Sequence, residues 1–320
     1  MKQTIAPPAS HASGQRHLAI AFVVLAVVFA LLPIWIYPFF LMKLMCFALF
    51  ACAFNLLLGF SGLLSFGHAM FFGVAGYVSA HAAKVWAFPP ELAILSATVV
   101  AAILAAVTGL LAIRRQGIYF AMITLAMSQM VYFFCLQAPF TGGEDGIQAV
   151  PRGRLFGLID LNQTMAMYIF VMVIFLAGFA LVWRVVTSPY GQILKAIREN
   201  EARALSLGYN VDAYKLIAFV LSGTLAGLAG GTKAIVVQLA SLTDVHWSMS
   251  GDVVLMTLIG GLGTLWGPVA GAAVIMAMHN YLADLGAWVL FVQGLIFVVC
   301  VMAFRRGIVG EISHWFKKSL

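Results

Sequence analysis

The sequence predicts an all-α fold: a polytopic integral membrane protein with about ten transmembrane crossings, including one broken or re-entrant segment. Of its 320 residues, 63% are hydrophobic and 9% are charged, whereas soluble proteins carry about 25% charged residues. Apolar runs recur along the chain, and about 20 such residues cross a bilayer as a helix. The net charge of +7 comes from basic residues in connecting loops, which is typical of membrane topology rather than of a nucleic-acid groove.

Apolar runs near membrane length set the expected spans. The stretch 252–283 is too long for one upright helix, and glycines followed by Pro268 interrupt it. We therefore expect a short piece at 252–262, either a half-helix or a re-entrant segment, followed by a span at 267–282, because broken helices are tolerated where protein covers their backbone. The other expected spans are 18–36, 39–58, 66–83, 91–112, 117–136, 166–186, 213–237 and 286–304.

Charge bias orients these spans, since basic residues concentrate on the cytoplasmic side. With a cytoplasmic N-terminus, five basic residues fall outside and the remainder of the 18 fall inside. An unbroken 252–283 would move Arg305 and Arg306 outside, so the bias favours the split and places both termini in the cytoplasm. The five expected outside are Lys43, Lys84, Arg152, Arg154 and Lys233. The expected domains are a flexible cytoplasmic tail at 1–17, a transmembrane domain at 18–304 and a cytoplasmic C-terminal tail at 305–320.

The segment 188–210 is the longest polar stretch between apolar runs, and its sequence predicts one helix on the cytoplasmic surface. Ser188 suits the N-cap, and Pro189 suits the first helical position, where a missing N–H costs nothing. Gly208 falls where a left-handed C-cap is expected. The helix is too short to cross a bilayer.

The same helix is expected to present two different faces. Lys195 to Glu199, and Glu199 to Arg203, are spaced to form ion pairs along one face. The residues leave two interpretations open: a surface helix that contacts a soluble partner, or a solvated interfacial helix without one. The expected apolar stripe comprises Ile193, Ile197 and Leu205, with Ala204 beside it.

Glycines interrupt the apolar run 55–77, in which Ser61, Ser65 and His68 are polar groups. A break at membrane depth exposes backbone groups that need partners, and in a transporter substrate or water can supply them. Close helix packing is the other interpretation, and for His68 a hydrogen bond between helices is the simplest role. Stripes of small residues that predict tight helix contacts are Gly223, Gly227 and Gly231, and Gly263, Gly267 and Gly271.

A polar loop at 137–165 is expected on the outer side. It either receives a docking protein or is a plain, turn-rich connection. Elsewhere the sequence has no phosphate-binding loop, no HExxH zinc motif, no cysteine pair at metal spacing and no catalytic set that spacing can nominate. Mid-span positions carry few charges, which indicates an energy source outside this chain. A stand-alone channel or secondary carrier remains an alternative, and an integral-membrane enzyme lacks a nominated catalytic group.

Six stretches, in this order along the chain, resemble the permease subunits of bacterial branched-chain amino-acid ABC importers, specifically the LivM-type member of the paired permeases. The stretches are GFSGLLSFGHAMFFGVAGY (59–77), GIYFAMITLAMSQ (117–129), TGGEDGI (141–147), YGQILKAIRENEARALSLGYNV (190–211), LSGTLAGLAGG (221–231) and IGGLGTLWGPVAGA (259–272). The resemblance implies a permease in the bacterial inner membrane. Its implied partners are a LivH-type sister permease, two cytoplasmic ATPase subunits, a periplasmic substrate-binding protein and the lipid bilayer.

The resemblance makes 190–208 the helix that docks in a groove of an ATPase. The general ABC-permease loop reads Glu-Ala-Ala, three residues, then Gly; here Gly208 comes one position late after Glu201-Ala202-Arg203. This departure leaves open whether Glu199 or Glu201 makes the main contact. The implied coupling residues are Gly191, Arg198, Glu199, Asn200, Glu201, Arg203 and Gly208.

The resemblance also implies that this chain has no catalytic residue, no metal and no cofactor of its own, because ATP and Mg are used by the partner subunits. Branched-chain amino acids are the implied substrates, with urea, short amides and aromatic or dicarboxylic compounds as alternatives within the same branch. The residues expected along the translocation pathway are Asn55, Ser61, Ser65, His68, Tyr119 and Thr124. Those expected to dock the binding protein are Thr141, Gly142, Gly143, Glu144 and Asp145.

Overall fold

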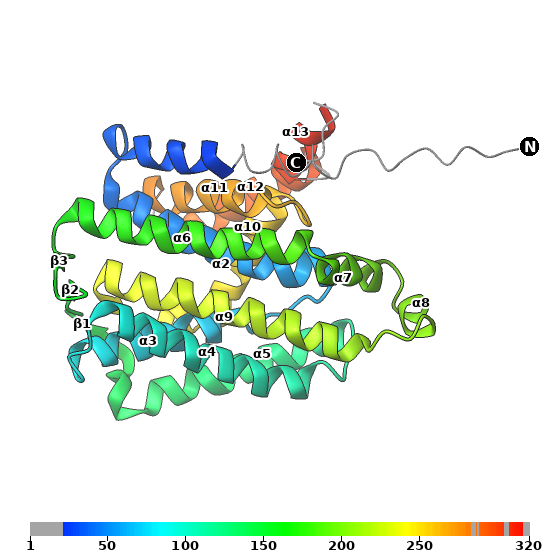
Figure 1. Cartoon of the computed structure of the whole chain (residues 1–320), viewed down its shortest axis with the longest axis horizontal. Helices are drawn as coiled ribbons and strands as arrows, with labels where there is room; N and C mark the ends of the chain where they lie inside the picture. Colours follow the sequence, from blue (N-terminus) through cyan, green and yellow to red (C-terminus); the bar gives the residue numbers. More distant parts are fainter. Residues whose placement is uncertain (1–21, 283–285, 287, 304–306, 316–320) are drawn as a thin grey trace, which may run out of the picture.

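Long apolar helices lie side by side and run between two ends of the molecule (Figure 1). The computed structural model describes residues 22–282, 286, 288–303 and 307–315, so the expected N-terminal tail at 1–17 lies outside the described residues. The helices are Phe22–Ile34, α2 (Pro38–Asn55), α3 (His68–Lys84), α4 (Pro90–Ala112), α5 (Ile118–Gln137), α6 (Thr164–Thr187), α7 (Pro189–Glu199), α8 (Glu201–Ser206), α9 (Val211–Val237), α10 (Trp247–Gly260), α11 (Gly267–Tyr281), α12 (Trp288–Ala303) and α13 (Gly307–Trp315).

In the described part of the chain, five helices are long and apolar enough to cross a membrane. They are α2 with its π-helical extension η2 (Leu56–Ser61), α4, α5, α6 and α9. The chain is therefore an all-α, multi-pass membrane protein, as predicted. Helices α3, α10 and α11 have 17, 14 and 15 residues, which rise about 21–26 Å against a hydrocarbon core of about 30 Å. The expected total of about ten crossings stays a prediction.

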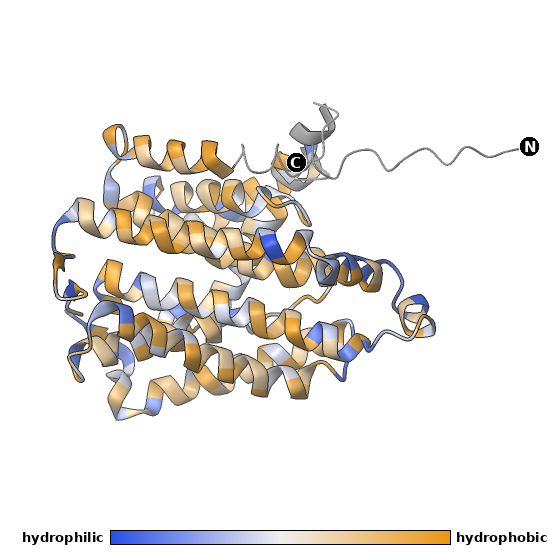
Figure 2. Cartoon of the chain, in the orientation of Figure 1, coloured by the Kyte–Doolittle hydropathy of each residue, from blue (hydrophilic) through white to orange (hydrophobic). Residues whose placement is uncertain are grey.

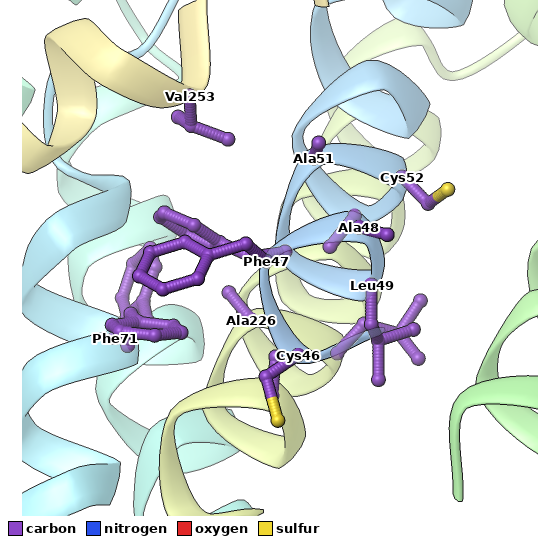
Figure 3. Packing of buried hydrophobic residues seen from close by; sticks show 14 of the residues in the cluster. Cys46, Phe47, Ala48, Leu49, Ala51, Cys52, Phe71, Ala226 and Val253 are labelled. Atoms are coloured by element: carbon purple, nitrogen blue, oxygen red, sulfur yellow. The ribbon is translucent and has the colours of Figure 1, made fainter. Parts of the chain in front are cut away.

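Helix α2 is the centre of the bundle, and 89% of its apolar window is buried. A helix that is apolar on every side is expected in the middle of a protein. Figure 3 shows side chains of α2, such as Phe47, lying among residues of three neighbouring helices: Phe71 of α3, Ala226 of α9 and Val253 of α10.

Small residues bring α9 close to its neighbours, as the sequence predicts. An added Cβ at Gly227 would lie 2.2 Å from the Ala101 Cβ of α4, and one at Gly230 would lie 1.9 Å from the Phe72 carbonyl of α3. Helix α9 could not approach α3 and α4 so closely if Gly227 and Gly230 carried side chains. The expected second stripe is only partly right: Gly263 lies in a turn with φ +71°, while Gly271 packs against the Met256 carbonyl of α10.

The stretch 252–283 is broken, which confirms the predicted split. Helix α10 begins at Trp247, five residues earlier than expected, and ends at Gly260; α11 begins at Gly267. Gly261 and Gly263 take positive φ angles of 124° and 71° in the turn between them, a conformation that favours glycine.

The two ends of the bundle differ. One end holds two short antiparallel ribbons: β1 (Ile147–Gln148) pairs with β4 (Leu239–Ala240), and β2 (Arg154–Leu155) pairs with β3 (Ile159–Asp160). We call it the ribbon end, and the opposite end, which carries α7 and α8, the α7 end (Figure 1). Hydrophilic residues gather at both ends, whereas the helices between them are mostly apolar (Figure 2).

Helix α13 lies at the α7 end, within the stretch expected to be a C-terminal tail. An added Cβ at Gly307 would lie 2.4 Å from the Cα of Gly261, in the turn between α10 and α11. The first residues of α13 therefore pack against that turn, and they share one end of the bundle with the segment 188–210.

Candidate functional site

Helix α7 begins where the sequence predicts. The Ser188 hydroxyl accepts a hydrogen bond from the Gly191 backbone N–H at 3.3 Å, and Pro189 occupies the first turn. Gly191 has no room for a side chain, because an added Cβ would lie 2.4 Å from the Val186 carbonyl. The chain therefore folds back tightly from α6, which fixes α7 across the end of the bundle.

Aromatic contacts attach α7 to α9. The Tyr190 and Tyr214 rings stack with centroids 5.5 Å apart, and the Tyr190 hydroxyl donates to the Tyr214 carbonyl at 2.8 Å. Burial, with Tyr214 alongside, raises the pKa of the Tyr190 hydroxyl above its usual value. The hydroxyl thus stays protonated and remains a donor at physiological pH.

The expected single helix over 188–210 is wrong, because the chain breaks at Asn200. Asn200 is extended (φ −155°, ψ 96°), and its side chain accepts from the Arg203 N–H at 3.0 Å to cap a second helix, α8. Asparagine offers the backbone this local alternative to a continuing helix. Gly208 follows α8 with φ +87°, the left-handed conformation predicted for it.

The break also changes the expected faces. Neither the Lys195–Glu199 pair nor the Glu199–Arg203 pair forms among the described residues, and for the second pair the break at Asn200 removes the helical spacing it needs. Leu205 was expected on the apolar stripe but is 65% exposed on α8. The other stripe residues are placed as predicted: Ile197 and Ala204 are buried, with Ile193 packed against them.

Glu201 binds within the chain. One carboxylate oxygen accepts from the Gln116 side chain at 2.7 Å, and the other lies 2.7 Å from the ammonium of Lys215 on α9. The Lys215 side chain is only 5% exposed, so Glu201 neutralises a charge that would otherwise be buried alone. Glu199 is exposed instead. The two acids between which the sequence leaves the main partner contact open therefore lie in different environments.

Arg198 extends from α7 into a socket made of three glycines. Its guanidinium donates to the carbonyl of Gly59 in η2. Added Cβ atoms at Gly62 and Gly263 would lie 3.1 Å from the Arg198 side chain. Glycine at these positions therefore lets the arginine reach two broken segments at once, the end of η2 and the turn between α10 and α11.

Asn55, the last residue of α2, clamps the start of η2 to the turn between α10 and α11. Its amide donates to the Thr264 carbonyl at 2.8 Å and accepts from the Gly263 N–H at 3.1 Å. Gly59 lies within the clamp, since an added Cβ there would be 2.2 Å from the Asn55 oxygen. Asn55 is 1% exposed, and its side chain serves two backbone groups of the turn between α10 and α11, where the helical ladder is interrupted.

A cleft of about 460 Å³ opens beside this arrangement at the α7 end. The Lys195 ammonium lies 5.6 Å from the centroid of the Phe60 ring there. The cleft thus combines backbone of the broken segments with two cations and one anion of α7. Its lining residues are Gly59, Phe60, Lys195, Arg198, Glu199 and Gly263.

The six residues predicted along a translocation pathway do not line this cleft. Ser61 donates to the Leu57 carbonyl at 2.6 Å, one turn back in the same segment. Ser65 and Thr124 are both fully buried and accept from the N–H groups of Gly67 and Phe66, at 3.2 Å each. These contacts satisfy the glycine-interrupted backbone, as the packing interpretation anticipates.

His68 and Tyr119 lie in different environments, one buried and one exposed. The His68 ring, fully buried, exchanges a hydrogen bond with the Ser222 hydroxyl of α9 at 2.8 Å, which confirms a bond between helices. Tyr119 is 69% exposed at the start of α5. A role for these residues in translocation stays a prediction.

The predicted docking loop lies at the ribbon end, opposite α7. Thr141 is buried and donates to the Ala138 carbonyl at 2.6 Å, while Gly142 and Gly143 take positive φ angles of 79° and 59°. This turn presents Glu144 and Asp145 to the exterior.

Two polar contacts, one buried and one partly buried, were missed by sequence reasoning, which expected almost no charge at mid-span positions. The Lys233 ammonium of α9 lies 2.6 Å from the carboxylate of Asp244, and both residues are buried. Asp252 of α10 accepts from the Gln293 amide of α12 at 2.9 Å. Lys233 and Asp244 stand 11 residues apart, and no helical spacing predicts their pairing.

Comparison with known proteins places these features in context. The family described as branched-chain amino acid transport system / permease component matches residues 36–301. The LivM permease proteins of the high-affinity branched-chain amino acid transport systems of Salmonella typhimurium and Escherichia coli K12 are 23% and 24% identical over 282 and 287 residues. Each alignment covers 79% of this chain and 65% of the relative, so the chain spans less than two thirds of those proteins' length.

A shorter match involves a probable LivH permease of Methanocaldococcus jannaschii, 27% identical over 125 residues, which covers 38% of this chain and 37% of that protein. No solved structure matches the chain.

Proposed function

Because the chain belongs to the branched-chain amino acid transport system permease family, whose members are transport components and not enzymes, we propose that it is a permease subunit of an ATP-binding-cassette importer for branched-chain or related amino acids. It pairs with a LivH-type sister permease. Two cytoplasmic ATPases, which use ATP and Mg, drive it, and a periplasmic binding protein supplies substrate. This assigns the α7 end and both termini to the cytoplasm and the ribbon end to the periplasm.

The observation that carries this proposal is the way α7 is joined to the bundle. Its buried face rests on α6 and α9, its exposed face carries Glu199, and Arg198 reaches inward to the Gly59 carbonyl. An ATPase that moves α7 thereby displaces η2 directly. Through the Asn55 clamp the same displacement reaches the turn between α10 and α11.

The two acids of this segment take different roles in the proposal. Glu199 contacts the ATPase, because it is exposed and lines the cleft beside α7. Glu201 holds α8 against α9 and the loop that carries Gln116. In this proposal Glu201, the residue at the glutamate position of the general permease loop, makes contacts within the chain and not with the ATPase.

Co-purification with the ATPases tests this assignment. We expect Glu199→Lys to reduce the ATPase recovered with the permease by about tenfold, since a repulsive contact replaces an attractive one. Asp160→Lys at the ribbon end makes the same charge change and is expected to leave recovery unchanged. Full ATPase recovery and full ATP-driven uptake with Glu199→Lys would contradict the coupling role.

A stand-alone channel or secondary carrier predicts a different result. Reconstituted without partner subunits, the chain is expected to give no substrate flux into liposomes. Flux in the absence of the ATPases and ATP would exclude an obligate importer subunit.

A further inference from the structure

We propose that Lys233, Asp244 and Tyr77 form a site in the periplasmic half of the bundle that binds the charged backbone of an amino-acid substrate. The inference rests on the proposed function, and it selects zwitterionic amino acids over urea and short amides. It concerns residues that lie outside the α7 site.

The central feature is the buried ion pair between Lys233 and Asp244. A buried pair is weak support for folding, because well-packed apolar residues of similar size are often equally stable or better. Ionisable residues within membrane spans are functional candidates by default. Lys233 is 7% exposed and Asp244 is 6% exposed, so this pair needs a reason other than stability.

Lys233 and Asp244 together offer one ammonium group and one carboxylate, 2.6 Å apart. A substrate that carries both charges can pair with both of these groups.

The Tyr77 hydroxyl provides an unused hydrogen-bond donor. Tyr77 is 3% exposed, yet its hydroxyl has no hydrogen-bond partner among the described residues. Tyr77 lies one helical turn after Gly73, whose added Cβ would be 2.8 Å from the Val245 backbone. Since residues four apart share a helix face, Tyr77 faces the segment that holds Asp244.

These groups complement an α-amino acid. Its carboxylate matches the Lys233 ammonium group and the Tyr77 hydroxyl, and its ammonium group matches Asp244. Urea and neutral amides can hydrogen-bond to these groups, but they carry no charges with which to form ion pairs with Lys233 and Asp244.

The site connects to the predicted docking loop through the ribbon. Strand β4 lies between Lys233 and Asp244 in sequence and pairs with β1. Gly146, which follows the predicted docking residues 141–145, touches β4, because an added Cβ would be 2.2 Å from the Ala240 carbonyl. A protein bound at Glu144 and Asp145 thus lies next to the segment that carries Asp244.

The test uses the complete complex reconstituted in liposomes with radiolabelled leucine. We expect Tyr77→Phe to raise the KM for leucine by about tenfold, the effect of losing one hydrogen bond to a charged group, with little change in the maximal rate. This substitution removes an oxygen that has no described partner, so folding is preserved. An unchanged KM would overturn the proposal.

Two double variants separate recognition from structure. Lys233→Asp with Asp244→Lys keeps an ion pair in reversed order, and Lys233→Met with Asp244→Leu keeps apolar packing. If the pair only supports the fold, an assembled variant of either kind takes up leucine within about twofold of the wild type, and the inference fails. We expect both to lose at least tenfold while the ATPases still co-purify; where neither variant assembles, Tyr77→Phe decides.

The wild-type complex distinguishes this inference from its premise. ATP-driven uptake of urea but not of leucine would overturn the carboxylate site and leave the importer assignment intact. Uptake that is independent of ATP would instead refute the proposed function.

Discussion

Replacing Asn55 by alanine tests whether this residue is a structural clamp or part of a substrate pathway. The side chain joins the last residue of α2 to the turn between α10 and α11, through one hydrogen bond to Thr264 and one to Gly263. The alanine variant removes both bonds and leaves a backbone carbonyl and a backbone N–H without the partner they have in the native protein.

The expected loss in the free energy of unfolding follows from these two backbone groups. Each buried polar group left without a partner costs about 1–3 kcal/mol. Both bonds are partly buried, so we take the lower half of this range, about 1–2 kcal/mol each, for a total of about 2–4 kcal/mol. Ser61→Ala is the matched control: its hydroxyl bonds a carbonyl one turn back in its own segment, and its removal is expected to change stability by less than about 1 kcal/mol.

Unfolding in mixed detergent micelles with rising denaturing detergent measures both free energies on the same scale. A pathway role without a clamp predicts that Asn55→Ala alters the KM for substrate and leaves the free energy of unfolding unchanged. An alanine variant as stable as the Ser61→Ala control would refute the clamp.

Three other substitutions test neighbouring parts of the account. Arg198→Lys keeps the charge but loses the guanidinium hydrogen bond to the Gly59 carbonyl. We expect ATPase co-purification to persist and ATP-driven uptake to fall about tenfold, the equivalent of roughly 1.4 kcal/mol. Unchanged uptake would show that this bond does not transmit movement of α7 to η2. Glu201→Gln leaves Lys215 without its counter-charge. Because Glu201 is one-third exposed, we expect the contact between α8 and α9 to lose about 1–2 kcal/mol of stability. Faster tryptic cleavage after Arg203 measures this loss. Gly227→Ala places a Cβ 2.2 Å from Ala101 and is expected to destabilise the protein by about 1–3 kcal/mol. The control, Gly251→Ala, has nothing within 4 Å of the added Cβ and is expected to be neutral or to stabilise by up to about 1 kcal/mol. Equal effects of the two substitutions would contradict the packing of α9 on α4.

Local sequence signals determined the features that depend on neighbouring residues. The apolar runs predicted the long helices, and Ser188 with Pro189 predicted the start of α7, because a cap bonds to a backbone N–H only a few residues away. Glycines before Pro268 predicted the break between α10 and α11. The left-handed turn at Gly208 follows from the same local chemistry.

The break at Asn200 marks the limit of that reasoning. Charge spacing across 195–203 favours one helix with two ion pairs, whereas the Asn200 side chain caps a second helix and Glu201 pairs with Lys215, fourteen positions along the chain. Helical spacing carries no information about which of these wins, because the choice depends on where α9 lies.

Tertiary structure alone decided the roles of the polar residues at membrane depth. Asn55 and Gly263 are more than 200 positions apart, and Lys233 meets Asp244 only because the ribbon folds the chain back toward α9. Composition and periodicity determined that this chain is a helical membrane protein. Packing determined which buried polar groups satisfy broken backbone and which, such as the Tyr77 hydroxyl, keep bonding capacity that the described fold does not use.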